Sequence, residues 1–226
     1  MLSFSAIIFF IDALVWYIFS WKSWAIKKEE PKNSLIKHFF ITFFILANAY
    51  FLFDVVIVII NENYQAAILL KIIADFILYT SFSYGIKIPV SIIFPKVNDD
   101  IPFAILFSLS MLATVLNVIS PPHPFLSAIG IIHWNLTPII SFGIYVLCLG
   151  MWLPIAGMFF IEGKKDVIYR KRYWIMALGF LITSISGPIS VTANSDYAAA
   201  LTQFLMTIGH ITILIGLLTK VREKSK

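Results

Sequence analysis

Hydrophobic residues form seven long runs along the chain, separated by short stretches that hold most of the charged residues. A transmembrane helix needs about 20 predominantly apolar residues, and each run comes close to that length or exceeds it. The apolar positions are continuous and do not alternate, so a transmembrane β-barrel does not fit. The pattern predicts an all-α integral membrane protein, a single seven-helix transmembrane domain over residues 1–226. The predicted spans are residues 2–21, 35–60, 66–94, 101–120, 135–161, 173–191 and 198–218.

Prolines predict where these helices bend. A proline inside a helix removes a backbone hydrogen bond and clashes with the preceding turn. We therefore expect the over-long third span to break or tilt near Pro89. Pro138 and Pro154 in the fifth span, and Pro188 in the sixth, are candidate hinges for a moving part, although proline is also common in membrane helices.

The connection after the fourth span has its own expected structure. Residues 120–124 (SPPHP) cannot continue a helix. Behind them we predict a short helix in the membrane interface over residues 125–133. Trp16 and Trp134 lie close to predicted span ends, where tryptophan is enriched, and are expected at the interface.

Charge predicts the orientation. Of the 17 Lys and Arg residues, 16 fall in or beside the connections after the first, third and fifth spans or after the last span, and only Lys71 falls on the other side. By the positive-inside rule this places the N-terminus outside and the C-terminus in the cytoplasm. We therefore expect a multi-pass protein of the cell membrane, whose partner is the lipid bilayer.

Composition excludes several other classes of protein. With 60% hydrophobic and 13% charged residues the chain is too apolar for a soluble globule or a disordered protein. The single Cys148 excludes a disulfide framework. The net charge of +5 does not indicate nucleic-acid binding, because the basic residues lie in the connections of an apolar chain.

Ionisable residues inside predicted spans are the first candidates for function, since burying each in lipid costs about 2.5–3.5 kcal/mol. Lys71 and Asp75 share a helix face at i,i+4 spacing. Asp54 lies on the preceding, antiparallel helix, so the three side chains are expected to meet in the outer half of the bundle. The cluster either pins two helices together or lines a polar pocket for a ligand, ion or proton. Further candidate lining residues are Asn48, Asn117 and Gln203.

Asp12 and His210 form a second candidate group near the middle of the first and seventh spans. In a closed ring of seven helices the first and last helices touch, so the two side chains are expected to pair. A carboxylate beside an imidazole is able to act as a pH or proton switch. The alternative is that His210 bonds a serine or threonine on a neighbouring helix and never titrates.

Signals for an enzyme or a metal site are weak. His123 and His133 supply two metal ligands in a proline-rich connection, fewer than the three or four that a zinc site uses. No nucleophile–base arrangement is visible, so we expect neither catalytic residues nor a metal.

Two families resemble this chain in topology. Microbial rhodopsins share seven spans and a basic–acidic pairing on the third helix, here Lys71 and Asp75. That family binds retinal through a lysine in the seventh helix, and residues 198–219 contain none. We therefore expect no retinal and no other cofactor.

The chain also resembles the N-terminal seven-helix sensor region of microbial histidine kinases over nearly its whole length. The likeness rests on residues 117–123 (NVISPPH) and on residues 169–172 (YRKR) before a span with glycine and proline. A kinase output domain does not follow residue 226 in this sequence. The resemblance implies a freestanding sensor-like module that acts on a separate partner.

These observations together predict a receptor or sensor. It is expected to bind a small-molecule ligand or respond to protons in its outer half, and to signal to a cytoplasmic partner. The alternative is a small transporter or channel that moves a cation, a proton or a small solute along the same acidic residues.

Overall fold

A computed structural model describes residues 3–219 as eight helices and one short hairpin. Seven helical stretches are long and apolar enough to cross a membrane, with α3 and α4 together forming one of them. The prediction of seven helices of membrane-spanning length is thereby confirmed. The helices are α1 (Phe4–Glu29), α2 (Ser34–Ile59), α3 (Tyr64–Gly85), α4 (Lys87–Ile93), α5 (Asp100–Ile119), α6 (Pro138–Lys165), α7 (Arg170–Thr192) and α8 (Asp196–Leu218).

Short polar side chains begin four of the helices. Ser3, Asn33, Asn63 and Ser195 each accept a hydrogen bond from the backbone N–H three residues on, at the start of α1, α2, α3 and α8. An N-cap of this kind satisfies one of the donors that the first turn leaves free. The polar residues between the apolar runs therefore start the helices as well as separating them.

The third span breaks at Ile86, between α3 and α4. Pro89 lies just beyond the break, and its ring would clash with the carbonyl of the residue four positions earlier, Gly85. The predicted break near Pro89 is confirmed. The other prolines behave differently: Pro154 and Pro188 lie inside continuous helices, whereas Pro138 is at the first turn of α6. The hinge hypothesis for Pro138 is wrong, because the first turn needs no N–H from that residue.

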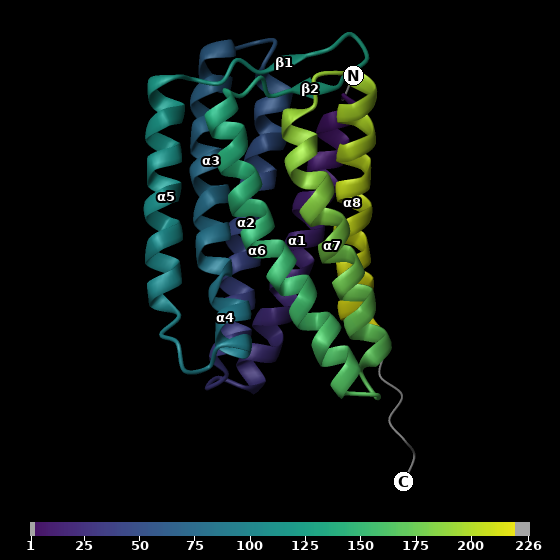
Figure 1. Ribbon diagram of the computed structural model, residues 1–226. Coiled ribbons are helices and arrows are strands. Elements are labelled where there is room, and N and C mark those ends of the chain that lie inside the picture. Colours follow the sequence, from purple (N-terminus) through teal and green to yellow (C-terminus); the bar gives the residue numbers. More distant parts are fainter. Residues whose placement is uncertain (1–2, 220–226) are drawn as a thin grey trace.

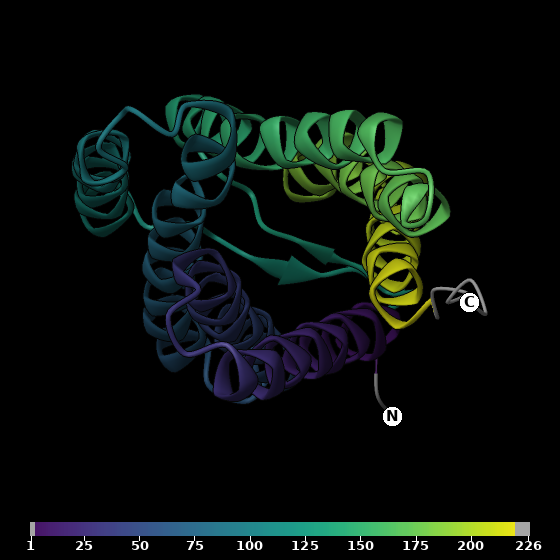
Figure 2. The ribbon, with the colours of Figure 1, turned by 90° about the horizontal axis from the view of Figure 1, so that it is seen from below.

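The helices form a ring with one member outside it. Figure 2 shows α1, α2, α3, α6, α7 and α8 around a central axis. α5 lies outside this ring and contacts α3. The first and last helices contact each other and close the ring. Among the residues of α5 only Ser110 and Asn117 are buried, and both face α3.

A β-hairpin crosses one end of the ring (Figure 1). Its strands are β1 (Phe125–Leu126) and β2 (Ile132–His133), paired antiparallel. The predicted interfacial helix over residues 125–133 is therefore wrong. The turn contains Gly130 with a φ of +79°, a conformation that glycine adopts without steric cost. We call this end of the bundle the hairpin end.

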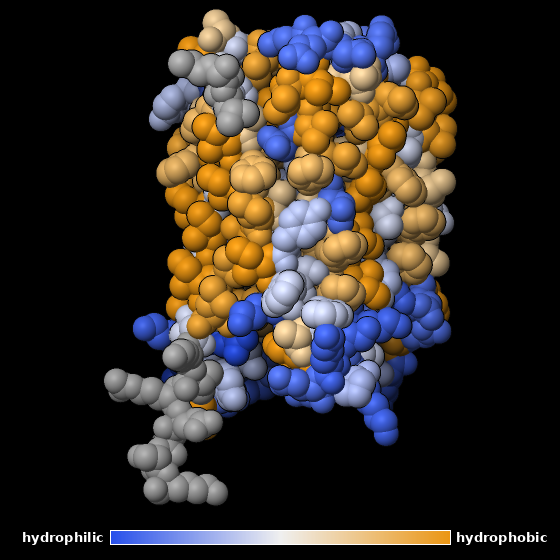
Figure 3. Space-filling view, turned by 180° about the vertical axis from the view of Figure 1, so that it is seen from behind, coloured by the Kyte–Doolittle hydropathy of each residue, from blue (hydrophilic) through white to orange (hydrophobic). Residues whose placement is uncertain are grey.

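The opposite end carries the turns between α1 and α2 and between α6 and α7, and it receives the end of α8. We call it the basic end, because the described Lys and Arg residues other than Lys71 lie in its connections and helix ends. The space-filling view in Figure 3 shows a broad hydrophobic belt between hydrophilic residues at the two ends.

The belt consists of side chains that point out of the bundle. On α1, Ile7, Phe10 and Leu14 are 45–47% exposed, whereas Phe9, Ala13 and Trp16 are buried. A water-soluble fold would bury such a continuous apolar surface. The seven apolar helices thus fit a multi-pass membrane protein.

Stacked aromatic rings fill the centre of the ring of helices. Trp16 stacks on Phe43 at 4.8 Å and on Trp152 at 5.5 Å between ring centroids, and Trp152 lies 5.4 Å from Phe180. All four side chains are buried, and we call them the aromatic layer. The expected interfacial position of Trp16 is wrong, because α1 continues 13 residues beyond it, to Glu29.

Candidate functional site

Lys71 and Asp75 form an ion pair inside the bundle. The Lys71 Nζ donates to both carboxylate oxygens of Asp75, each at 2.6 Å. From α5, the Asn117 side-chain amide donates to the same carboxylate at 3.1 Å. Lys71 is 2% and Asp75 1% exposed. We call Lys71, Asp75 and Asn117 the lysine cluster, and the pairing predicted for Lys71 and Asp75 at i,i+4 spacing is present.

Two aromatic rings enclose the Lys71 ammonium. Its Nζ lies 4.8 Å from the ring centroid of Trp134 and 5.2 Å from that of Phe53, distances at which a cation–π attraction is significant. Trp134 directly follows β2 and is 2% exposed. The hairpin folds back and delivers this ring into the bundle, so Trp134 does not lie on the outer surface of the helices.

Asp54 does not join the lysine cluster. It is half-buried on α2, and among the described residues it makes no hydrogen bond or ion pair with Lys71 or Asp75. The prediction that all three side chains meet is wrong for Asp54. Its neighbour Phe53 faces Lys71 instead, and adjacent residues of an α-helix point about 100° apart.

Asn48 and Gln203 also lie in other hydrogen-bond networks. The Asn48 side chain accepts from the hydroxyl of Tyr17 at 3.1 Å, and so links α2 to α1. Gln203 accepts from the hydroxyl of Ser5 at 2.7 Å and donates to the carbonyl of Ile132 at 3.3 Å. This second network fastens the hairpin to α1 and α8. Of the three amides proposed to line a pocket, only Asn117 reaches the lysine cluster.

Asp12 and His210 contact each other across the closure of the ring. The Asp12 Oδ1 and the His210 Nδ1 are 2.8 Å apart, and both side chains are fully buried. The predicted contact is therefore present, and we call it the histidine pair. Within residues 3–219, this hydrogen bond joins the middle of α1 to α8.

The other polar atoms of the histidine pair lack partners among the described residues. Neither Asp12 Oδ2 nor His210 Nε2 has a hydrogen-bond partner there, although both are buried. The imidazole packs edge-on against Trp16 at 4.7 Å and Tyr50 at 5.3 Å. Buried polar groups are nearly always satisfied in native proteins, so two such atoms in one pair single out this contact.

His123 and His133 have separate partners at the hairpin end. The His133 Nε2 lies 2.6 Å from a carboxylate oxygen of Asp196, and its ring stacks on Phe125. The His123 Nδ1 lies 3.3 Å from the hydroxyl of Tyr64. Within residues 3–219 no group of three or more His, Cys, Asp or Glu side chains is placed to hold a metal ion.

Comparison with known proteins gives no further assignment. No family model, curated protein or solved structure matches this chain.

Proposed function

We propose that this protein is a receptor or sensor of the cell membrane, with its hairpin end outside and its basic end in the cytoplasm. The apolar belt supports insertion in a bilayer. The gathering of Lys and Arg at one end supports the orientation, because such residues are retained on the cytoplasmic side. An odd number of spans then leaves the N-terminus outside.

The observation that carries the proposal is the histidine pair. A histidine gains or loses its charge between about pH 5 and 8, and here it contacts the carboxylate of Asp12 with no exposure to solvent. A proton added to this pair changes the charge at the contact between the first and last helices. The titratable side chain facing it from α2 is Tyr50.

The lysine cluster is the proposed site for a small ligand in the outer half. Its members are buried in the conformation described, so a ligand reaches them only after Trp134 and the hairpin move. A ligand that prefers the opened state would shift the population of the two states. In the conformation described, the lysine cluster thus holds the outer side of the bundle closed.

The change must reach the cytoplasm through the helices. α6 and α7 contain Pro154 and Pro188 in their interiors and join at the basic end. Prolines leave backbone carbonyls without their usual partners, and helices bend at such points. We propose that a separate cytoplasmic partner reads the position of these two helices, as the resemblance to sensor regions of histidine kinases implies.

A transporter remains the second candidate, because the lysine cluster lies in the span of α3, where ionisable residues mark ion paths in other membrane proteins. The aromatic layer argues against it, since its four buried rings pack against one another inside the ring of helices. Proton or cation flux into liposomes that Asp75→Asn abolishes would favour transport over sensing.

The test uses spectroscopic labels at the basic end. Cys148 is buried, so cysteines placed at exposed Lys28 and Lys165 can carry spin labels in reconstituted protein. We expect the distance distribution between the labels to change between pH 8 and pH 5, and Asp12→Asn to remove the change. Asp54→Asn is the matched control, since it neutralises a carboxylate that lies outside the pair. A pH response that survives Asp12→Asn unchanged contradicts the proposal.

A further inference from the structure

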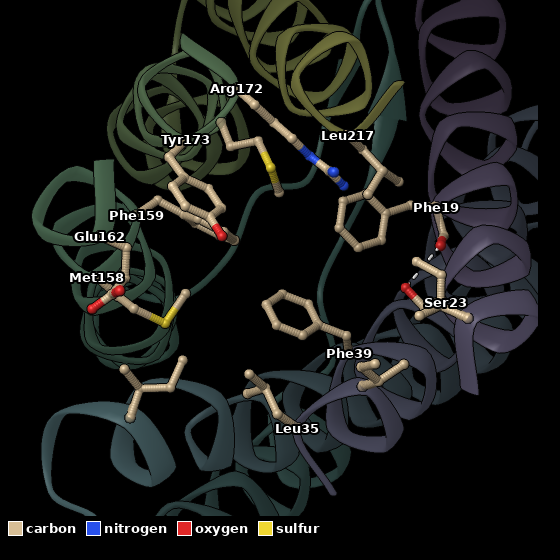
Figure 4. A pocket seen from close by; sticks show the side chains of 14 residues that line it. Phe19, Ser23, Leu35, Phe39, Met158, Phe159, Glu162, Arg172, Tyr173 and Leu217 are labelled. Atoms are coloured by element: carbon tan, nitrogen blue, oxygen red, sulfur yellow. Dashed lines mark hydrogen bonds between the residues drawn. The ribbon is translucent and has the colours of Figure 1, made fainter. Parts of the chain in front are cut away.

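A pocket of about 490 Å³ opens inside the ring of helices at the basic end. Its walls come from α1, α2, α4, α6, α7 and α8, and are mostly apolar (Figure 4). The side chains that form the floor and sides include Phe19, Leu35, Phe39, Met158, Phe159 and Leu217. Pockets of about 300–1,000 Å³ with apolar walls and a few polar groups are typical of small-molecule sites.

One cation points into this pocket. In Figure 4 the guanidinium of Arg172 extends from the first turn of α7 into the space between Tyr173, Leu217 and Phe19. Its Nε is buried and has no acceptor among residues 3–219, and Arg172 makes no ion pair with them. A buried guanidinium donor without an acceptor is costly, so the geometry leaves a place for an anion.

The neighbouring acid does not satisfy Arg172. Glu162 lines the edge of the pocket, but its carboxylate points away from it in Figure 4 and accepts from the ammonium of Lys165 at 2.7 Å. The hydroxyl of Tyr173 also points into the pocket, on the side of Phe159. Arg172 is thus the one cationic side chain among the described residues that line this mostly apolar space.

We propose that this pocket binds a small anionic amphiphile, with its carboxylate or phosphate head at Arg172 and its apolar chain against Phe19, Phe39 and Phe159. A free single-chain carboxylate from the aqueous phase is the occupant that fits best. Six helices supply the walls of the pocket at the basic end, so we expect a ligand to enter from that end and not sideways from lipid. The site lies beyond the proposed function, whose groups are the lysine cluster and the histidine pair.

The general excess of basic residues at this end does not explain Arg172. Lys164, Lys165, Arg170 and Lys171 belong to the same excess, and they do not line the pocket. Orientation in a membrane requires only that such residues stay on one side of it. It does not require a guanidinium directed into an apolar cavity.

The test measures binding of radiolabelled decanoate to protein in phosphatidylcholine nanodiscs, with empty nanodiscs as the blank. We expect saturable binding of one decanoate per chain. Arg172→Gln should weaken it about ten- to hundredfold, because a hydrogen bond to a charged group is lost. Lys171→Gln, which removes the same charge from the same turn outside the pocket, should change it less than about twofold.

A second variant fills the pocket without touching Arg172. Leu35→Trp replaces a partly buried branched side chain with a bulkier indole ring in the apolar wall, and it should also reduce decanoate binding. Decanol, which lacks the charge, should compete poorly.

An equal loss of decanoate affinity in Arg172→Gln and Lys171→Gln, or no saturable binding, overturns the proposal. Displacement of decanoate by phosphatidylglycerol built into the nanodisc overturns the free carboxylate as occupant and assigns the anion site to a lipid. Binding of an acidic helical peptide in place of decanoate overturns it in favour of protein docking.

Discussion

Replacing Asp75 with asparagine leaves the Lys71 ammonium buried without its counter-ion. In the intact protein this ammonium is 2% exposed and donates to both carboxylate oxygens at 2.6 Å. Removing one partner of a buried pair costs about 3–5 kcal/mol, because the remaining charge is neither solvated nor neutralised. The cation–π contacts with Trp134 and Phe53, each worth about 0.5–2 kcal/mol, are present in parent and variant alike and do not replace the lost carboxylate.

The assay is thermal unfolding of purified protein in detergent, followed by helical circular dichroism. For a chain of this size each kcal/mol shifts the Tm by about 2–4 °C, so Asp75→Asn should lower it by about 6–20 °C. The double variant Lys71→Met with Asp75→Leu is the informative control. It removes both charges at similar volume and should recover most of the loss, because apolar replacements of buried pairs are often neutral or stabilising.

Two results would refute this reasoning. A Tm of Asp75→Asn within about 2 °C of the parent would mean that Lys71 reaches water or another anion. A double variant as unstable as Asp75→Asn would mean that the carboxylate is needed for something other than neutralising Lys71.

Three further predictions concern packing, the hairpin and orientation. Gly179→Ala should lower the Tm, because a Cβ there would lie 2.7 Å from the carbonyl oxygen of Gly209, whereas Gly150→Ala, with open space around it, should leave the Tm unchanged or raise it. Gln203→Leu should speed amide hydrogen exchange across residues 125–133, as it removes the bonds to Ser5 and Ile132, while Asn48→Leu should leave that exchange unchanged. In sealed, right-side-out vesicles a membrane-impermeant maleimide should label a cysteine at exposed Ile129 but not one at exposed Lys165; the opposite pattern would reverse the proposed orientation.

The number of helices and the pairs at helical spacing could be predicted from the sequence. Runs of about 20 apolar residues identify membrane helices without knowledge of their packing. The i,i+4 spacing of Lys71 and Asp75 places them on one face of any helix. The contact of Asp12 with His210 followed from depth and from closure of the ring, and the structure has it at 2.8 Å.

The predictions that proved wrong concern the direction in which side chains point around a helix. Asp54 was expected beside Lys71 from depth alone, but its neighbour Phe53 occupies that position. The burial of Trp134 could not be predicted, because it depends on a hairpin whose turn rests on Gly130 and on bonds to Ser5 from another part of the chain. Apolar helices with lipid on one side and protein on the other lack the polar face that reveals rotation in a soluble helix.

We expect the aromatic layer to couple the two ends of the bundle in the proposed sensor. Trp16, Phe43 and Trp152 are buried and stacked on one another, and the buried Phe180 packs at a tilt against Trp152. Close-packed side chains pass a displacement on to their neighbours, because protein interiors are nearly incompressible. Trp16 also contacts the imidazole of His210 at 4.7 Å. If the histidine pair changes charge as proposed, we expect it to act first on Trp16, and through Trp16 on Trp152 of α6 and Phe180 of α7. These two helices also supply Met158, Phe159 and Arg172 to the pocket. An anion held at Arg172 would favour one position of these same helices, so pH and the amphiphile are expected to be coupled, and by linkage each must alter the affinity for the other to the same degree.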